Sequence, residues 1–350
     1  MSLDTIDPYR VADMLERDLG RDAMRLFRDG DVTELFVNVG HEHLWVDSHS
    51  KGLHETEVTV SKATVRTFLQ RAADFAGENI TDRNPRVECS LPQPTWGGSR
   101  LTGILPPASP EPVFCLRKFS DEVIPLDSFV PNEIISSHQH SFLLDSIENH
   151  KSIGIVGGTG SGKTTMAMSI LDQVCQFDPD CRILTMEDTR ELQIPRSRNW
   201  IPLCTYPGGS FVDLISMSLR LTPDRIVVGE CRGPALIALF EAFISGHPGG
   251  VFTYHAHNVE ETLKRFLINC KRDSDTDSHQ HTIGSAVDVL VILTKEDGYR
   301  FVPQMVEVNG FSDRSGYDLN WIPRDPESPT PPGHYWRPEP LRQPEYAVAS

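Results

Sequence analysis

The sequence predicts an α/β fold, in which a doubly wound parallel-sheet domain follows a smaller α+β domain. After residue 136, short apolar runs are bounded by glycine, aspartate or helical segments, which is typical of strands buried on both faces of a parallel sheet. Before residue 126, strands that alternate apolar and polar residues stand between amphipathic helices. The chain of 350 residues is long enough for two domains, each with its own core.

The first domain is expected to span residues 1–125 and to begin with a helical pattern over residues 8–29. The apolar side chains of this pattern gather on one side, and Gly20 is expected to split or bend the helix. A hairpin over residues 33–47 follows, and then a second amphipathic helix capped by Ser61. Two short strands around a proline-rich turn complete the domain.

Arginine side chains gather on the other side of the first helical pattern, and two interpretations are open. A basic face of this kind can contact anionic lipid headgroups or an acidic partner. The same arginines can instead form a solvated face that pairs with neighbouring aspartates. The arginines are Arg10, Arg17, Arg21, Arg25 and Arg28, and the aspartates are Asp13, Asp18 and Asp22.

Residues 126–135 are expected to form a linker, because the surrounding segment carries prolines and few periodic apolar residues. The second domain is expected to span residues 136–325. The tail, residues 326–350, is rich in proline and is expected to be disordered or polyproline-like. The apolar runs that predict the parallel strands of the second domain are 151–158, 181–187, 225–230, 250–256 and 287–293.

Composition narrows the possible classes of function. The 33 basic and 49 acidic residues give a net charge of −16, so no stable nucleic-acid binding is predicted. The seven cysteines form no CxxC pair, and their odd number fits no simple set of disulfides. The first residues have neither the basic segment nor the apolar run of a signal peptide. We therefore expect a cytoplasmic protein that can lie on a membrane.

Residues 157–164 match the phosphate-binding pattern G-x-x-x-x-G-K-[ST], between a predicted strand and a predicted helix. Glycines in this loop let backbone N–H groups converge on phosphates at the start of the helix. Lys163 is expected to reach the terminal phosphates, and the Thr164 hydroxyl is expected to ligate Mg²⁺. The second domain is thus predicted to be a RecA-like P-loop domain with ATP and Mg²⁺ as cofactors. The nucleotide-binding residues expected in the loop are Gly158, Thr159, Gly160, Ser161, Gly162, Lys163, Thr164 and Thr165.

Two carboxylates follow the second apolar run, and a third follows the next run. Glu187 and Asp188 stand where strand ends meet at a ligand crevice, so a carboxylate there can orient water or hold the outer shell of a metal. A solvated helix cap at Asp188 is the alternative. Glu230 ends a segment shaped like a Walker B strand, although Gly229 stands where an aspartate usually precedes the glutamate.

His255 and His257 end a further predicted strand and point to one face of it. A metal site, a phosphate sensor or hydrogen-bond partner, and an ordinary satisfied histidine all remain open for this pair. The same H-x-H spacing occurs at 41–43, 138–140 and 279–281, so it is weak evidence for a metal.

Four stretches together resemble the motifs of the secretion-motor ATPase superfamily, which are "GGTGSGKTT", "MEDTREL", "LRLTPDRIVVGECRG" and "SGHPGGVFTYHAHN". The superfamily covers type IV secretion and conjugation ATPases, type II secretion ATPases and type IV pilus motors. In the first domain, "TELFVNVGHEHLWVD" and "SLPQPTWGGSRLTGILPPASPEPVFCLRKFS" are similar to the type IV secretion and conjugative-transfer branch. The resemblance covers residues from roughly 30 to 320.

The resemblance implies a homohexameric ring at the cytoplasmic base of a secretion channel, peripheral to the inner membrane and working with other components of the system. It implies that nucleotide binds between the two domains of a subunit. It also implies a water-activating role for Glu187, a Walker B role near Mg²⁺ for Glu230, and a place near the γ-phosphate for His255.

The resemblance further implies roles for five arginines. Arg100 and Arg117 match arginines of the first domain that close over the phosphates. Arginines around the Walker B segment are expected near the nucleotide or at a subunit contact, and these are Arg220, Arg225 and Arg232. His257 departs from the family pattern, in which a small polar residue is more usual.

Two alternatives to a type IV secretion motor stay open. A type IV pilus or type II secretion motor shares every motif of the P-loop domain, although the missing CxxC pair counts against the type II branch. A nucleotide-gated scaffold with negligible turnover would explain the missing aspartate before Glu230. A helicase is disfavoured by the net charge and by the lack of an aromatic and basic stacking pattern.

Overall fold

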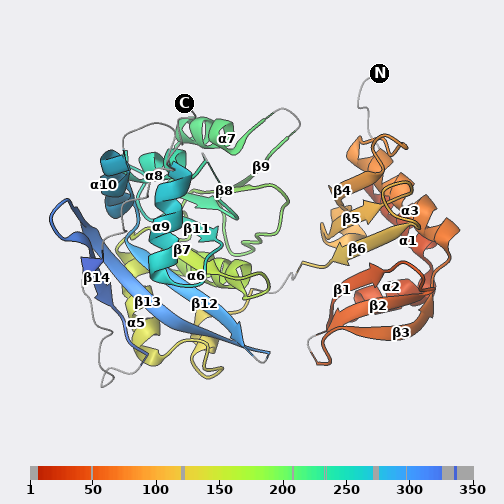
Figure 1. The fold of residues 1–350 in the computed structure, drawn as a ribbon, viewed down its shortest axis with the longest axis horizontal. Coiled ribbons are helices and arrows are strands. Elements are labelled where there is room, and N and C mark those ends of the chain that lie inside the picture. Colours follow the sequence, from red (N-terminus) through yellow and green to blue (C-terminus); the bar gives the residue numbers. More distant parts are fainter. Residues whose placement is uncertain are drawn as a thin grey trace, which may run out of the picture. The chain divides into compact units, whose positions relative to one another are not determined.

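The computed structural model describes residues 7–324, except 49, 120–122, 207–208, 232, 234, 271–275 and 297, together with residues 335–336. The chain divides into two compact units, and Figure 1 labels most of their helices and strands. Unit 1 is Met1–Glu122 with Thr189–Glu191, and unit 2 is Val123–Asp188 with Leu192–Ser350.

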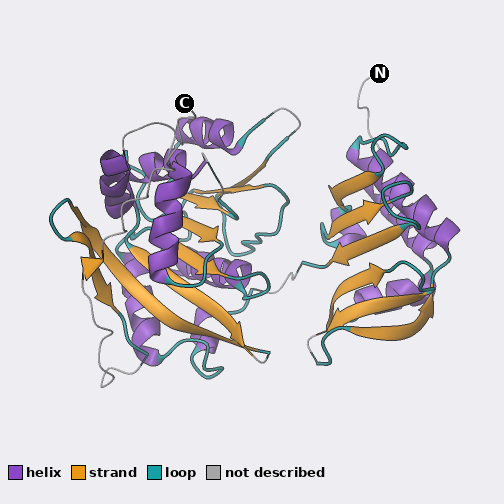
Figure 2. Ribbon diagram, in the orientation of Figure 1, coloured by secondary structure: helices purple, strands orange, loops and turns teal. Residues whose placement is uncertain are grey.

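Unit 1 is an α+β unit with a six-stranded antiparallel sheet in the order β3-β2-β1-β6-β5-β4. Figure 2 shows helices packed beside this sheet. The strands are β1 (Val32–Val37), β2 (His43–Ser48), β3 (His54–Thr59), β4 (Arg86–Ser90), β5 (Arg100–Ile104) and β6 (Val113–Arg117). The helices are α1 (Pro8–Leu19), α2 (Arg21–Arg28), α3 (Lys62–Ala76) and α4 (Gln93–Trp96).

Local sequence explains where these helices begin and end. Gly20 has φ +90° and separates α1 from α2, which confirms the predicted break. The Ser61 side chain accepts a hydrogen bond from the Thr64 backbone N–H at 3.1 Å, which confirms the predicted cap of α3. Trp96 is fully buried in the core of the unit, and its indole N–H donates to the Ala12 carbonyl at 3.3 Å.

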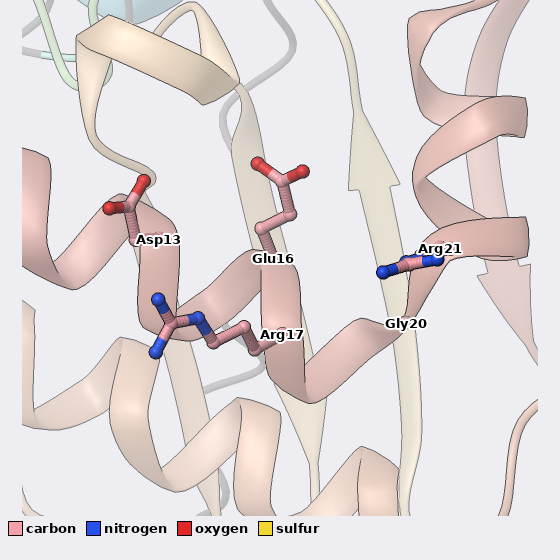
Figure 3. A pocket seen from close by; sticks show the side chains of 5 residues that line it. All are labelled: Asp13, Glu16, Arg17, Gly20 and Arg21. Atoms are coloured by element: carbon pink, nitrogen blue, oxygen red, sulfur yellow. The ribbon is translucent and has the colours of Figure 1, made fainter.

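The arginine face of α1 and α2 borders an open hollow of about 420 Å³ (Figure 3). Acidic and basic side chains line it together, because Asp13, Glu16, Arg17 and Arg21 all face it. The ion pairs nearby differ from the predicted set: Arg28 pairs with Glu16 at 2.7 Å, and Asp18 pairs with Arg71 of α3. Contact of this face with a membrane or an acidic partner stays a prediction.

Unit 2 is built on a nine-stranded sheet in the order β15-β14-β13-β12-β7-β11-β10-β8-β9. All strands from β12 to β9 in this order pair in parallel, whereas β13, β14 and β15 add antiparallel pairs at one side. The predicted apolar runs are the strands β7 (Ile153–Gly157), β8 (Ile183–Glu187), β10 (Arg225–Val228), β11 (Val251–Tyr254) and β12 (Val289–Glu296). The strands β9 (Trp200–Cys204), β13 (Tyr299–Ser312), β14 (Gly316–Trp321) and β15 (Tyr335–Trp336) were not predicted.

Helices cover both faces of this sheet, as a doubly wound fold requires. Ile155 of β7 belongs to one apolar cluster and its neighbour Val156 to another, because successive side chains of a strand point to opposite faces. One cluster includes α5 (Ser137–Glu148) and α6 (Lys163–Phe177). The other includes α7 (Phe211–Ser218), α8 (Ala235–Ile244), α9 (Val259–Cys270) and α10 (Thr276–Ala286).

The segment 126–135, predicted to be a linker, is instead part of the core of unit 2. Leu126 and Phe129 are each 2 % exposed in the 3₁₀ helix η1 (Leu126–Phe129), and Ile135 is 1 % exposed. All three pack in the cluster that contains α5 and α6. The prediction is corrected because the two prolines around this segment were given more weight than its apolar residues, which are buried by packing in the cluster that contains α5 and α6.

Two further observations concern the tail and the lengths of the helices. Most of the tail, predicted to be disordered, lies outside the described residues, and its described residues form β15, which pairs with β14. In the part of the chain that the structure describes, no helix has both the length and the apolar character needed to cross a bilayer.

We expect Phe129→Ala to lower the free energy of unfolding by about 3–5 kcal/mol, because it removes a buried aromatic ring and leaves a cavity. Urea unfolding followed by circular dichroism measures this change. Phe177→Ala is the matched control, since Phe177 is 45 % exposed, and its effect should stay within about 1 kcal/mol. Equal and small effects of the two changes would mean that residues 126–135 behave as a linker.

Candidate active site

The P-loop joins β7 to α6, and packing requires one of its glycines while backbone conformation favours another. A Cβ atom on Gly157 would lie 2.4 Å from the Leu293 carbonyl oxygen, so a side chain cannot fit there. Gly162 has φ +98° and is the N-cap of α6. A glycine at the N-cap has no side chain with which to cap the helix, and no side-chain cap hydrogen bond forms at this residue. Such a helix start favours an anion.

Lys163 lies along the loop as the first residue of α6. Its ammonium Nζ donates to the carbonyls of Gly157 at 3.0 Å and Gly158 at 2.8 Å, and the residue is only 9 % exposed. The Ser161 hydroxyl donates to the Gly158 carbonyl at 2.9 Å. The ammonium is therefore held inside the loop, where phosphate oxygens are expected.

The other predicted nucleotide-binding residues lie in the same loop or in the first turn of α6. Thr159 and Gly160 are exposed at the tip of the loop, whereas Thr164 and Thr165 are half-buried at the start of the helix. Gly160 has φ +72°, a conformation that favours glycine. The structure thus brings all eight predicted loop residues to one place.

His255 links Lys163 to Glu230 across neighbouring strands. It follows β11, and Glu230 follows β10. The His255 Nδ1 atom lies 3.5 Å from Lys163 Nζ, and Nε2 lies 3.1 Å from Glu230 Oε1. Because a lysine ammonium only donates, Nδ1 is the acceptor and Nε2 carries the proton that is donated to Glu230. The three side chains form one polar line beside the P-loop.

Glu187 fills the space that an aspartate at position 229 would need. Its side chain is 4 % exposed at the end of β8, and its Oε1 accepts a hydrogen bond from the Leu192 backbone N–H at 3.0 Å. A Cβ atom on Gly229 would lie 2.7 Å from Glu187 Cγ and 3.0 Å from Oε1. Gly229 therefore packs directly against the Glu187 side chain, which comes from the neighbouring strand β8.

Asp188 and His257 stand outside this group. Asp188 is exposed and accepts from the Thr205 hydroxyl at 3.0 Å, and since no helix starts there, it is not a helix cap. His257 is exposed, and its backbone N–H donates to Glu261 at 2.9 Å. Among the described residues, no group of three or more histidine, cysteine, aspartate or glutamate side chains could hold a metal ion.

Arg100 and Arg117 are brought together in unit 1, because they face each other across β5 and β6. Arg100 forms an ion pair with Glu88, and Arg117 pairs with Glu34 at 2.6 Å. Partly exposed pairs of this kind contribute at most about 1 kcal/mol, so either arginine can exchange its carboxylate for a phosphate. Their contact with phosphates stays a prediction.

Arg225 does not lie at this site, which corrects the prediction for it. It is the first residue of β10, at the amino end of the strand, whereas the P-loop, His255 and Glu230 lie at the carboxyl ends. The side chain is 3 % exposed and donates to the carbonyls of Gly249 at 2.9 Å and Ile147 at 2.7 Å. Arg225 is close to Glu230 in the sequence, but the two residues lie at opposite ends of β10, so closeness in sequence did not place them at the same site.

The surroundings of Arg225 are those of a buried structural group. Burial lowers the pKa of its guanidinium, and burial raises the pKa of the neighbouring Cys181 thiol to about 11. Arg220 is exposed in the 3₁₀ helix η2 (Leu219–Leu221), which precedes the same end of β10, and its role at a subunit contact stays a prediction. Arg232 lies outside the described residues.

Comparison with known proteins identifies the family. Residues 55–295 match the family model described as type II/IV secretion system protein. The chain belongs to this family. The conjugal transfer protein TrbB of Rhizobium radiobacter is 31 % identical over 302 residues, which are 86 % of this chain and 91 % of TrbB.

Two solved structures share the fold of this chain. The ATPase DotB of Legionella pneumophila matches with a TM-score of 0.60 and 18 % identity, over 90 % of this chain and 84 % of DotB. The pilus retraction motor PilT with bound ADP also matches with a TM-score of 0.60 and 18 % identity, over 83 % of this chain and 79 % of PilT. The predicted family and fold class are confirmed. DotB is an ATPase, and PilT has bound ADP, which agrees with the predicted enzyme class.

Two arginines near the site of this secretion-family protein were not predicted from the sequence. Arg265 of α9 donates to the His255 carbonyl at 3.0 Å and pairs with Glu261 at 2.8 Å. Arg300 of β13 donates its Nε–H to the Gly160 carbonyl at 3.2 Å. The Asp-Gly turn before Arg300 predicts a hairpin, but no local pattern indicates that the hairpin reaches the P-loop.

We expect Gly229→Ala to lower the free energy of unfolding by about 1–3 kcal/mol, because the new Cβ overlaps Glu187 Cγ. Glu187→Ala removes the overlapping atoms, so the double variant should recover most of that loss. Urea unfolding of all four proteins gives the coupling energy. Gly158→Ala is the control, since no atom lies within 4 Å of its Cβ position. Additive effects of the two changes would contradict the packing described.

We expect Arg225→Met to lower the free energy of unfolding by about 2–4 kcal/mol, since two buried carbonyls lose their donor. Its affinity for ADP, measured by titration calorimetry, should not change. The exposed Arg220→Met is the control for stability and should stay within about 0.5 kcal/mol of the wild type. A stable Arg225→Met protein with weakened ADP binding would return Arg225 to the nucleotide site.

Proposed function

We propose that this secretion-family protein is a motor ATPase of the type IV secretion and conjugal-transfer type, which hydrolyses ATP to drive substrate translocation or pilus biogenesis. The observation that carries the proposal is the polar line from Lys163 through His255 to Glu230, beside a P-loop and next to the buried Glu187. The likeness to a conjugal transfer protein along most of both chains supports this branch of the family.

The residues of the loop fit the phosphates of ATP with bound Mg²⁺. The glycine loop, the start of α6 without a side-chain cap and the ammonium of Lys163 all favour an anion at one point. Lys163 would exchange the neutral carbonyls of Gly157 and Gly158 for phosphate oxygens, which accept stronger, charge-assisted hydrogen bonds. Thr164 and Glu230 would hold Mg²⁺, whose chemistry is to neutralise charge on the transferred phosphoryl group.

His255 would report the state of the phosphates to Glu230. Its Nδ1 atom accepts from Lys163 only while the ammonium stays inside the loop. When Lys163 turns to phosphate oxygens, Nδ1 loses this donor and the imidazole is free to turn toward the γ-phosphate. The hydrogen bond from the Nε2–H group to Glu230 would then break, and the Glu230 carboxylate would become available for Mg²⁺.

Glu187 would orient the attacking water. It is the one carboxylate of the group that is almost fully buried, and its position is fixed by the Leu192 N–H and by Gly229. A fixed carboxylate can accept a proton from water as water attacks the phosphoryl group. Arg100 and Arg117 would supply further positive charge to the phosphates.

The assembly is proposed as a homohexamer at the cytoplasmic side of the inner membrane, in contact with other components of the secretion system. A type IV pilus or type II secretion motor is the second candidate, because PilT shares the fold as closely as DotB does. The sequence likeness to TrbB favours the conjugal-transfer type. A scaffold with negligible turnover is opposed by the packing of Glu187 into the space at Gly229, which keeps a carboxylate in the site.

We expect ATP hydrolysis to rise with protein concentration as a hexamer forms, and Glu187→Gln to lower kcat about 100-fold or more. Phosphate release and light scattering on the same samples measure both. Asp188→Asn is the matched control, because the Asp188 carboxylate is next to Glu187 in the sequence but is exposed and accepts a hydrogen bond from Thr205. This variant should retain most of the activity. A wild-type hexamer that binds ATP without turnover would favour the scaffold.

A further inference from the structure

The P-loop has two flanks, because β7 lies between β11 and β12 in the sheet. The β11 flank carries His255, as described. On the other flank, Leu293 of β12 pairs with Gly157 in register, and its carbonyl oxygen leaves no space for a side chain on that glycine. The strand then continues into a hairpin with β13, in which Lys295 faces Arg300.

Arg300 extends from this hairpin along the outside of the loop. Its Nε–H donates to the Gly160 carbonyl at 3.2 Å. Its Cδ atom lies 3.4 Å from the position of a Cβ on Gly162, and Nε lies 3.9 Å from the same position. The side chain therefore passes the N-cap glycine of α6 and ends at the tip of the loop.

This contact restrains the part of the loop that has least conformational preference of its own. Gly160 and Gly162 both have positive φ angles, and glycine loses more conformational freedom on becoming ordered than any other residue. In a trans peptide the C=O and N–H groups point in opposite directions. A donor that holds the Gly160 carbonyl on the outside therefore turns the Ser161 N–H toward the inside of the loop, where it donates to the Gly158 carbonyl at 3.4 Å.

We propose that Arg300 is a positioning residue of the nucleotide site: it fixes the Gly160–Ser161 peptide so that the P-loop is ordered for the diphosphate part of a nucleoside di- or triphosphate before the nucleotide arrives. The inference rests on the proposed nucleotide site and adds a residue that none of its motifs contains. Arg300 acts from outside the loop through a carbonyl, whereas Lys163 acts from inside.

The test compares Arg300→Ala with Lys295→Ala in the full-length protein. Lys295 is exposed and is the partner of Arg300 in the hairpin register, so its removal matches the change in charge without touching the loop. Calorimetry with ADP and with a non-hydrolysable ATP analogue gives the two affinities. We expect Arg300→Ala to weaken both about threefold to tenfold by an equal factor, and Lys295→Ala to leave both unchanged.

Hydrogen exchange distinguishes a positioning role from a general effect of charge. In the absence of nucleotide, amides of residues 158–162 should exchange faster in Arg300→Ala than in the wild type, and at the wild-type rate in Lys295→Ala. Thermal unfolding of the three proteins should coincide, because Arg300 is exposed at a hairpin tip. Equal affinities and equal exchange rates in Arg300→Ala and the wild type would overturn the inference.

Two further outcomes would also be informative. Selective loss of affinity for the ATP analogue would overturn the positioning role, since it would place Arg300 on the γ-phosphate. Lys163→Ala separates the inference from the proposed function. If the wild type binds no nucleotide, the proposed function fails; if Lys163→Ala abolishes binding while Arg300→Ala binds like the wild type, only the inference fails.

Discussion

Four parallel strands, β7, β11, β10 and β8, lie next to one another in the sheet of unit 2. The candidate active site depends on this order of strands. Parallel strands end at the same edge of a sheet, so one side chain from each strand end meets the others without a long loop. The P-loop, His255, Glu230 and Glu187 come from these four ends in that order. A side chain at the amino end of the same strands, such as Arg225, is carried to the opposite edge and serves packing instead.

The packing of Glu187 beside Gly229 explains why a glycine precedes Glu230 in the segment that resembles Walker B. A Cβ atom on Gly229 would lie 2.7 Å from Glu187 Cγ, so only one side chain can occupy the space between the ends of β8 and β10. In this protein Glu187 occupies it from β8, and Gly229 leaves it open from β10. The two positions are therefore one structural unit. Neither residue can be interpreted without the other: the missing aspartate, taken alone, is compatible with a scaffold, but Glu187 keeps a carboxylate at this position of the sheet.

The sequence was sufficient where the decisive pattern is local. Apolar runs identified the five central parallel strands, Gly20 identified the break between α1 and α2, and the P-loop pattern identified the phosphate-binding loop. It was insufficient where the decisive contact is distant along the chain. Leu126 and Phe129 are buried by helices that follow them, and Arg300 meets Gly160 from 140 residues away. Such contacts depend on sheet order, which local periodicity does not encode.

The two ends of the unit 2 sheet have a consequence for how copies of the chain can associate. At one end, β15 is only two residues long and covers part of β14; at the other, β9 contains Pro202, which has no N–H to donate. Short strands and prolines at sheet edges oppose the addition of a strand from another molecule. Growth of the sheet into an open fibre is thus disfavoured at both ends. Among the described residues of unit 2, the surfaces that stay suited to self-association are side-chain surfaces, whose geometry can close on itself and stop at a defined number of copies.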